Sequence, residues 1–281
     1  MSLISLLIAL ASERMVTSKT WRFNHYFLHY LQFALKFVSK YEISKSRVNL
    51  LAFAAIPAIA VWALLAFIDS SLVTFVTSTL LLVVCIGCSS AKESYKGFLN
   101  AAMRGDDVAL DYHQLQLQRN QQFTGESFGQ SLIWANFQYF MMIIMLYIVF
   151  GIVAVVFYRV LLALHSQVKN DDEQPVLDES CSKKVTSLLE VIEFIPARFA
   201  AFGYMLVGHF SKASTYWLEG LLNTQISSRQ YLCMVAKSSE EYEIAEGDLT
   251  AEPSLLVRLA KRNLLLLLAA IAFMTLAGVI S

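Results

Sequence analysis

The sequence predicts an all-α fold, that of a polytopic helical integral membrane protein. Only 16% of its 281 residues are charged and 57% are hydrophobic, whereas a soluble globular domain carries about 25% charged residues because its surface faces water. Several uncharged runs approach the roughly 20 residues that a helix needs to cross the hydrocarbon core of a bilayer. Patterns typical of strands are nearly absent. We therefore expect residues 1–281 to form a single helical membrane domain.

Four apolar stretches are predicted to span the membrane. Residues 48–68 and 72–88 contain no charge and are joined by Asp69-Ser70-Ser71, a link so short that it predicts a tight helical hairpin. Residues 139–162 and 263–280 form the third and fourth predicted spans, and the fourth is preceded by a cluster of basic residues.

Two further segments are predicted to be embedded or interfacial helices. Residues 2–12 are apolar, but no basic region precedes them as it would in a secretory signal. Residues 194–210 are strongly apolar, and we expect Pro196 in the first turn of this helix, where the missing N–H is tolerated. The sequence leaves open whether residues 194–210 cross the membrane, re-enter it or lie on its surface.

Polar segments separate these elements. Residues 21–41 alternate aromatic and basic positions at helical spacing and are typical of an amphipathic helix at a membrane surface. Residues 89–130 and 165–187 are predicted polar loops. Basic residues gather before the first span and are absent from the link that follows it, so the positive-inside rule places the N-terminal region and the first loop in the cytoplasm. The second loop is then external.

Charge and cysteine content exclude several function classes. Lys plus Arg and Asp plus Glu each total 22, so the net charge does not favour a nucleic-acid partner, and the lipid bilayer is the partner that the composition indicates. Cys85 and Cys88 form a C-x-x-C at the end of an apolar run, where we interpret them as small buried hydrophobes rather than as a redox or metal site. We expect no metal and no cofactor. No glycine-rich phosphate-binding motif is present.

Charged residues inside apolar segments are the candidates for function, because burying a charge in a membrane is costly. Arg198 follows Pro196 and lies close to Glu193. Its guanidinium could pair with an acid or with an anionic ligand, or it could extend to the lipid headgroups from an interfacial helix. Both interpretations stay open at this point.

The other candidates form smaller groups. Glu13 and Arg14 end the first apolar helix and are either an interfacial anchor or part of a polar site. Arg104 and Asp106 belong to a predicted turn with a helix cap, whose acids are an alternative metal site. The ligand-binding candidates, none of them assigned a catalytic role, are Glu13, Arg14, Arg104, Asp106, Glu126, Asn136, Glu193 and Arg198.

An ordered set of short motifs resembles the AmpE family. The set comprises Glu13-Arg14, Met103-Arg104-Gly105-Asp106, Leu132-Ile133-Trp134-Ala135-Asn136-Phe137, Ile195-Pro196-Ala197-Arg198 and Gly208-His209. The resemblance covers essentially the whole chain. It implies a multi-pass protein of the bacterial inner membrane that acts in signal transduction and is linked to β-lactamase induction, and thereby to antibiotic resistance, or to sensing of cell-wall status. The implied partner is a cell-wall-derived small molecule or another protein of the induction pathway.

A second, more distant similarity implies an alternative function. Residues 195–198 and the stretch Phe157-Tyr158-Arg159 are similar to the CobD/CbiB family of cobalamin biosynthesis, whose members form an amide bond as adenosylcobinamide-phosphate synthases. That family has a Gly-Asp-Pro turn after its first helix, and this chain departs from it with Ser12-Glu13-Arg14. We therefore expect a regulatory protein rather than an enzyme. A transporter is disfavoured because no inverted repeat is apparent.

Overall fold

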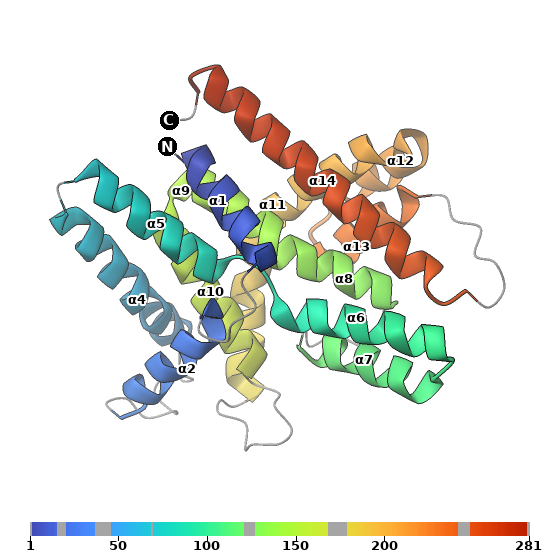
Figure 1. Ribbon diagram of the computed structural model, residues 1–281, viewed down its shortest axis with the longest axis horizontal. Coiled ribbons are helices and arrows are strands. Elements are labelled where there is room, and N and C mark those ends of the chain that lie inside the picture. The colour runs from blue at the N-terminus through green and yellow to red at the C-terminus, as the bar shows by residue number, and fades with distance from the viewer. Residues whose placement is uncertain are drawn as a thin grey trace. The chain divides into compact units, whose positions relative to one another are not determined.

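The predicted all-α fold is confirmed. The computed structural model describes residues 2–15, 21–36, 46–68, 70–120, 127–167, 179–240 and 248–279, and within these ranges the regular structure is helical, with no strand. The chain divides into two compact units (Figure 1). The first unit comprises Met1–Gly87, Ile143–Val191 and Ala277–Ser281, and the second comprises Cys88–Met142 and Ile192–Leu276.

The first unit is assembled around one buried helix. In chain order its elements are α1 (Ser2–Met15), α2 (Phe23–Ala34), α4 (Arg47–Phe67), α5 (Ser71–Cys85), most of α9 (Met142–Phe150), α10 (Ile152–Gln167) and the beginning of α11 (Glu179–Val207). Helix α10 packs against α2, α4 and α5, and its side chains Val155, Tyr158, Leu161 and Leu164 are fully buried. Helix α1 packs against α5 through Leu6.

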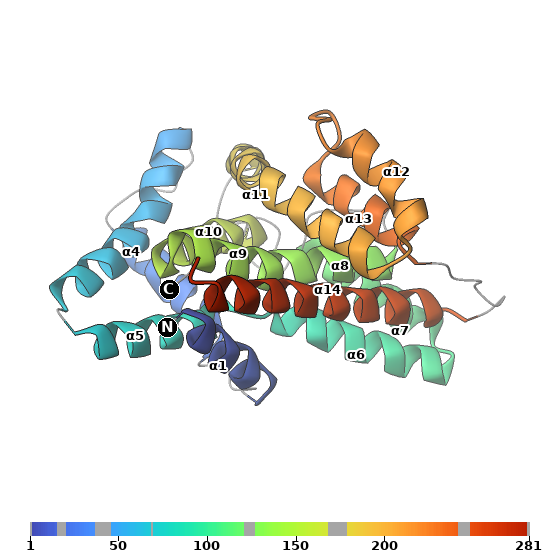
Figure 2. The same cartoon turned by 90° about the horizontal axis from the view of Figure 1, so that it is seen from above.

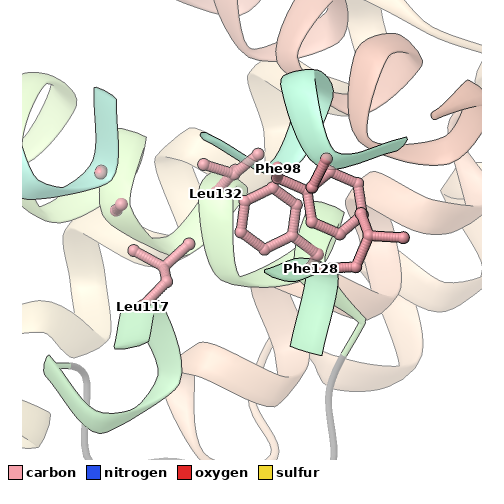
Figure 3. Close-up of a cluster of buried hydrophobic side chains, with 8 residues drawn as sticks. Phe98, Leu117, Phe128 and Leu132 are labelled. Atoms are coloured by element: carbon pink, nitrogen blue, oxygen red, sulfur yellow. The ribbon is translucent and has the colours of Figure 1, made fainter. Parts of the chain in front are cut away.

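The second unit contains the remaining elements. They are α6 (Ser89–Arg104), α7 (Asp107–Asn120), α8 (Phe128–Asn136), the π-helix η2 (Phe137–Met141), the rest of α11, α12 (Phe210–Gly220), α13 (Ser228–Ser238) and α14 (Ala251–Leu276). Helices α6, α7 and α8 lie side by side (Figure 1) around an apolar cluster. In that cluster the rings of Phe98 and Phe128 stack with centroids 4.1 Å apart, next to Leu117 and Leu132 (Figure 3).

The start of α8 is joined to the start of α14. Ser127 and Gln130 form a reciprocal capping box that satisfies the first N–H groups of α8, and the Ser127 hydroxyl donates to the Glu252 carboxylate over 2.7 Å. Gly129 allows the close approach, because a Cβ at that position would lie 2.8 Å from Leu256. This contact connects two helices that are far apart in the sequence.

Within the described residues, four stretches are long and apolar enough to cross a bilayer. They are Arg47–Phe67, Ser71–Arg104, Phe128–Phe150 and Ala251–Leu276. Large apolar side chains on α4 are exposed, among them Ile59 and Trp62, and a surface of this kind is stable against lipid rather than water. The chain is a helical membrane protein.

Helix boundaries differ from the prediction at several points. The segment predicted as the polar loop 89–130 contains α6 and α7, because Ser89–Arg104 has an apolar face that packs on α7 and α8. The segment predicted as one helix over 139–162 is interrupted at Gly151, whose φ of +77° ends α9. In the predicted loop 165–187, α10 extends to Gln167 and α11 starts at Glu179.

One further prediction was wrong in detail. Pro196 lies inside α11 and not in a first turn, because the helix starts at Glu179. Helices α4 and α5 follow one another after a short link, and each makes its largest contact with another helix, α4 with α10 and α5 with α1. By contrast, the predicted amphipathic helix within residues 21–41 is present as α2, and it buries Phe23, Phe27 and Leu31 on one face.

Candidate functional site

Four of the polar side chains that are buried inside the second unit form its candidate site. We call them the polar layer: Gln138 on η2, Glu193 and Arg198 on α11, and Asn263 on α14, which are exposed by 5%, 3%, 6% and 1%. Buried polar groups require hydrogen-bond partners to offset their lost hydration. The hydrogen-bond partners of each residue therefore show which segments the polar layer joins.

Arg198 binds the chain that connects α12 to α13. Its Nε donates to the carbonyl oxygen of Leu221 over 3.3 Å, and one Nη donates to the carbonyl oxygen of Asn223 over 3.1 Å. The other Nη donates to the carbonyl oxygen of Phe194 and to the hydroxyl of Ser228, at 3.1 and 3.2 Å. Four of the five N–H groups of the guanidinium are thus engaged with the protein itself.

Aromatic faces complete the surroundings of this cation. The Cζ atom of Arg198 lies 3.5 Å from the ring centroid of Phe194 and 4.9 Å from that of Tyr231. Ring quadrupoles attract a desolvated guanidinium. Among the described residues, no carboxylate lies within ion-pair distance of Arg198. Carbonyl dipoles and aromatic rings therefore stabilise the charge, a set of partners that neither sequence interpretation included.

Helix α12 is joined to α11 and to α13 by further hydrogen bonds next to Arg198. Trp217 Nε1 donates to the carbonyl oxygen of Arg198 over 3.4 Å, and the hydroxyl of Tyr231 donates to the carbonyl oxygen of Trp217 over 3.0 Å. Burial raises the pKa of Tyr231 to about 12, although Arg198 acts to lower it, so the phenol remains a donor at neutral pH. Gly220 lies against this ring, and a Cβ there would overlap it.

Glu193 is bound to the π-helix. Gln138 Nε2 donates to Glu193 Oε1 over 2.9 Å, and both side chains are buried. A π-helix inserts an extra residue into an α-helix and frequently marks a functional site. Asn136 lies immediately before η2, and its buried Oδ1 accepts no hydrogen bond within the described part of the chain. This segment therefore presents a carboxylate and an amide oxygen as acceptors.

Asn263 connects α14 to α11. Its Nδ2 donates to the carbonyl oxygen of Ala200 over 2.9 Å and lies 3.7 Å from the sulfur of Met141. Gly203 is required at this crossing, because a Cβ there would overlap Oδ1 of Asn263. Small residues at a helix crossing allow close backbone approach in membrane proteins.

The remaining sequence candidates lie elsewhere. Glu13 belongs to the first unit, where its side chain covers Gly87, and the side chain of Arg14 is outside the described part of the structure. Arg104 is exposed at the end of α6. Asp106 is also exposed and caps α7, accepting from the Ala109 N–H over 3.0 Å. Glu126 lies outside the described residues.

The structure thus buries both Glu193 and Arg198 in the second unit, with separate partners, and adds two residues that sequence reasoning missed. Gln138 and Asn263 each carry a polar amide within or at the start of an apolar run. An uncharged amide in such a run was the signal that could have identified them, because amides hydrogen-bond across membrane helices. In the described ranges no group of three or more His, Cys, Asp or Glu side chains is placed to hold a metal ion.

Comparison with known proteins shows a family match over the full length of the chain. The family model described as "Regulatory signalling modulator protein AmpE" matches residues 1–281. The chain is also similar to a curated protein of Shigella flexneri, "Protein AmpE", with 24% identity over 206 residues, which cover 69% of this chain and 71% of that protein. No solved structure matches the chain.

Proposed function

Because the chain belongs to the AmpE family of regulatory signalling modulators, we propose that it modulates β-lactamase induction or the sensing of cell-wall status. The family match over the whole chain is the observation that carries this proposal. It also confirms the resemblance that the short motifs indicated. Neither the family model nor the Shigella flexneri relative is described as a synthase, so we propose no enzymatic role.

The bacterial inner membrane is the proposed location, with several passes through the bilayer. Four apolar stretches of sufficient length support this placement. The distribution of Lys and Arg supports a cytoplasmic N-terminal region.

The polar layer of the second unit is the part of the molecule that we propose responds to a signal. The Glu193 carboxylate of this layer accepts from Gln138, and the amide oxygen of neighbouring Asn136, which accepts no hydrogen bond within the described residues, suits a ligand that carries N–H donors. A cell-wall-derived small molecule with amide or ammonium groups has this chemistry, and a protein partner in the membrane is the alternative source of the donors. Arg198 holds the α12–α13 connection and is a positioning residue in this proposal.

The test is a β-lactamase induction assay in a deletion strain. The strain is complemented with the unmodified chain, with Glu193→Gln or with Arg104→Ala, and membrane levels of each protein are measured in parallel. Glu193→Gln preserves shape but removes the negative charge of the polar layer. Arg104→Ala is the matched control, because Arg104 is exposed and outside the polar layer.

We expect deletion to change induction, and we expect the unmodified chain and Arg104→Ala to restore it while Glu193→Gln does not. Induction that is untouched by deletion would reject the proposed regulatory role. Full restoration by Glu193→Gln would leave the role intact and reject the polar layer as the responsive site.

A further inference from the structure

The second half of α11 and α12 form a short antiparallel hairpin, here called the α11–α12 hairpin (residues 192–220; Figure 2). The chain reverses at Gly208 and His209, where the His209 N–H donates to the Ser239 carbonyl over 2.6 Å. Phe202 lies against Trp217 with ring centroids 5.3 Å apart, and Arg198 reaches the carbonyl of Leu221 beyond the end of α12. As the chain advances along α11 from Arg198 to Phe202, the contacted residue moves back from Leu221 to Trp217, so the two arms are antiparallel.

The outer face of this hairpin is apolar along α11. From Ile192 to Val207, every exposed residue is apolar: Ile195, Phe199, Phe202 and Leu206. Ile195 and Phe199 are 64% and 66% exposed. Their spacing of four, three and four residues places all of them on one narrow stripe. The charged residues of the same segment, Glu193 and Arg198, are both buried, and Glu193 lies on the side of the helix opposite the stripe.

Helix α12 is too short to cross a bilayer, so the hairpin cannot cross it twice. Helix α12 has 11 residues and is therefore about 16 Å long, whereas the hydrocarbon core is about 30 Å thick. The connection beyond α12 exposes the polar residues Thr224 and Gln225, which would be costly deep in the hydrocarbon. Lys212 and Glu219 are exposed on α12 itself. This combination fits a hairpin that lies along a membrane surface with one face immersed.

The neighbouring helix identifies the surface that covers the stripe. Asn263 of α14 packs on α11 at Ala200, and Arg262 donates to the carbonyl oxygen of Val207 near the tip of the hairpin. Helix α14 as a whole, Ala251–Leu276, is a stretch of spanning length, and it exposes Leu265 and Phe273. The hairpin is therefore held against a helix that is long and apolar enough to cross the membrane. Arg262 is paired with Glu240, whereas the exposed cations Arg258 and Lys261 of the same part of α14 match the anionic headgroups of a leaflet.

We propose that the α11–α12 hairpin lies in a single leaflet, with the stripe of Ile195, Phe199, Phe202 and Leu206 against the acyl chains and its tip at headgroup level. The hairpin inserts without crossing, and the polar layer lies directly beneath it on the protein side. This proposal answers the topological question that the sequence left open for residues 194–210. It stands independently of the regulatory role.

Cysteine accessibility in native membranes tests the proposal. Phe199→Cys and Leu206→Cys place thiols on the stripe, and Lys212→Cys and Glu219→Cys are matched controls on the polar face of α12. Membrane vesicles opened on both sides are treated with a membrane-impermeant maleimide, before and after solubilisation in dodecyl sulfate. The chain with its native cysteines alone is the blank. Ile195→Cys replaces Phe199→Cys if that variant fails to accumulate in the membrane.

A thiol buried in hydrocarbon cannot form the reactive thiolate, so we expect labelling of the stripe to be about tenfold or more slower than labelling of the controls, with the difference lost in dodecyl sulfate. Equal rates in intact membranes would show that the stripe faces water and would overturn the proposal. A second outcome is slow labelling together with an oxidant-induced disulfide dimer. This dimer would form with the Phe199→Cys variant and not with the blank. That dimer would assign the stripe to a second copy of the chain, which also overturns the proposal.

Discussion

The pair α4 and α5 in the first unit and the α11–α12 hairpin in the second are both two-helix elements with large exposed apolar surfaces, but different forces hold them. The buried side chains of α4 are all apolar, and they are Leu50, Phe53, Ala54 and Ala58. The α11–α12 hairpin is instead joined through the guanidinium of Arg198 and the indole of Trp217.

Helix length explains the difference. The 21 residues of α4 satisfy almost all of their own backbone groups, so apolar contact with α10 suffices to hold the helix. Helix α12 has 11 residues, and the connection after it has carbonyl groups with no helical partner. A buried donor with several N–H groups must supply the missing hydrogen bonds, and Arg198 has that geometry. The buried charge thus accompanies a short helix whose following connection needs hydrogen-bond donors.

The strongest test of this comparison is Arg198→Ala. The substitution leaves the carbonyl groups of Leu221 and Asn223 without donors, and we expect a loss of roughly 3–5 kcal/mol in stability. Thermal unfolding in detergent, followed by tryptophan fluorescence, measures the change. Arg198→Lys should recover only part of the loss, since an ammonium group cannot reach all four acceptors. A melting temperature equal to that of Arg104→Ala would contradict the role assigned to Arg198.

A charged substitution on the exposed face of α4 tests whether that face contacts lipid, as the comparison requires. Ile59 is 58% exposed on a predicted span, and Ile59→Asp should cost about 3 kcal/mol of insertion free energy. The amount of protein recovered in the membrane fraction measures this cost. Ile59→Leu is the apolar control, and Lys212→Asp is a charged control at an exposed polar position. Normal membrane recovery of Ile59→Asp would show that this face of α4 does not contact lipid.

Gly203→Ala examines the crossing of α11 and α14. The added methyl group would overlap the side chain of Asn263, and we expect a destabilisation of about 1–3 kcal/mol from overpacking. The double variant Gly203→Ala with Asn263→Ser should regain part of this loss in the same thermal assay, because serine frees the space. Equal stability of Gly203→Ala and the unmodified chain would show that the two helices can separate without cost.

The smallest effect is expected at Asp106. Its carboxylate caps α7, so Asp106→Ala should cost about 1 kcal/mol, while Asp106→Asn should cost less because an amide oxygen also caps helices. Thermal unfolding of the two variants checks the order. If Mg²⁺ or Mn²⁺ raised the melting temperature of the unmodified chain but not of Asp106→Asn, the metal alternative for this turn would replace the cap.

Much of the fold followed from local pattern. Hydrophobic length predicted the apolar stretches, and helical spacing predicted the face of α2 that buries Phe23, Phe27 and Leu31. The prediction failed at two residues, a glycine and a proline, each of which is compatible with more than one local structure. Gly151 ends a helix inside a run of uniform hydropathy, and Pro196 lies within a helix although proline also favours a first turn.

The candidate site was less predictable than the fold. Glu193 and Arg198 were identified because a charge in an apolar segment is unusual, but their partners could not be read from the sequence. Gln138 lies 55 positions from Glu193, and Leu221 lies 23 positions from Arg198. Contacts at such separations depend on how helices pack.

The sequence by itself determined that this protein is helical, that it resides in a membrane and that it belongs to the AmpE family. Composition and apolar run length are local properties, and lipid imposes them on any chain that crosses it. Only the tertiary structure decided that Arg198 binds backbone carbonyls, that Gln138 pairs with Glu193 and that α11 and α12 form a short hairpin. Those features depend on which helix faces meet, and the free energy that selects them is shared among residues far apart in the chain.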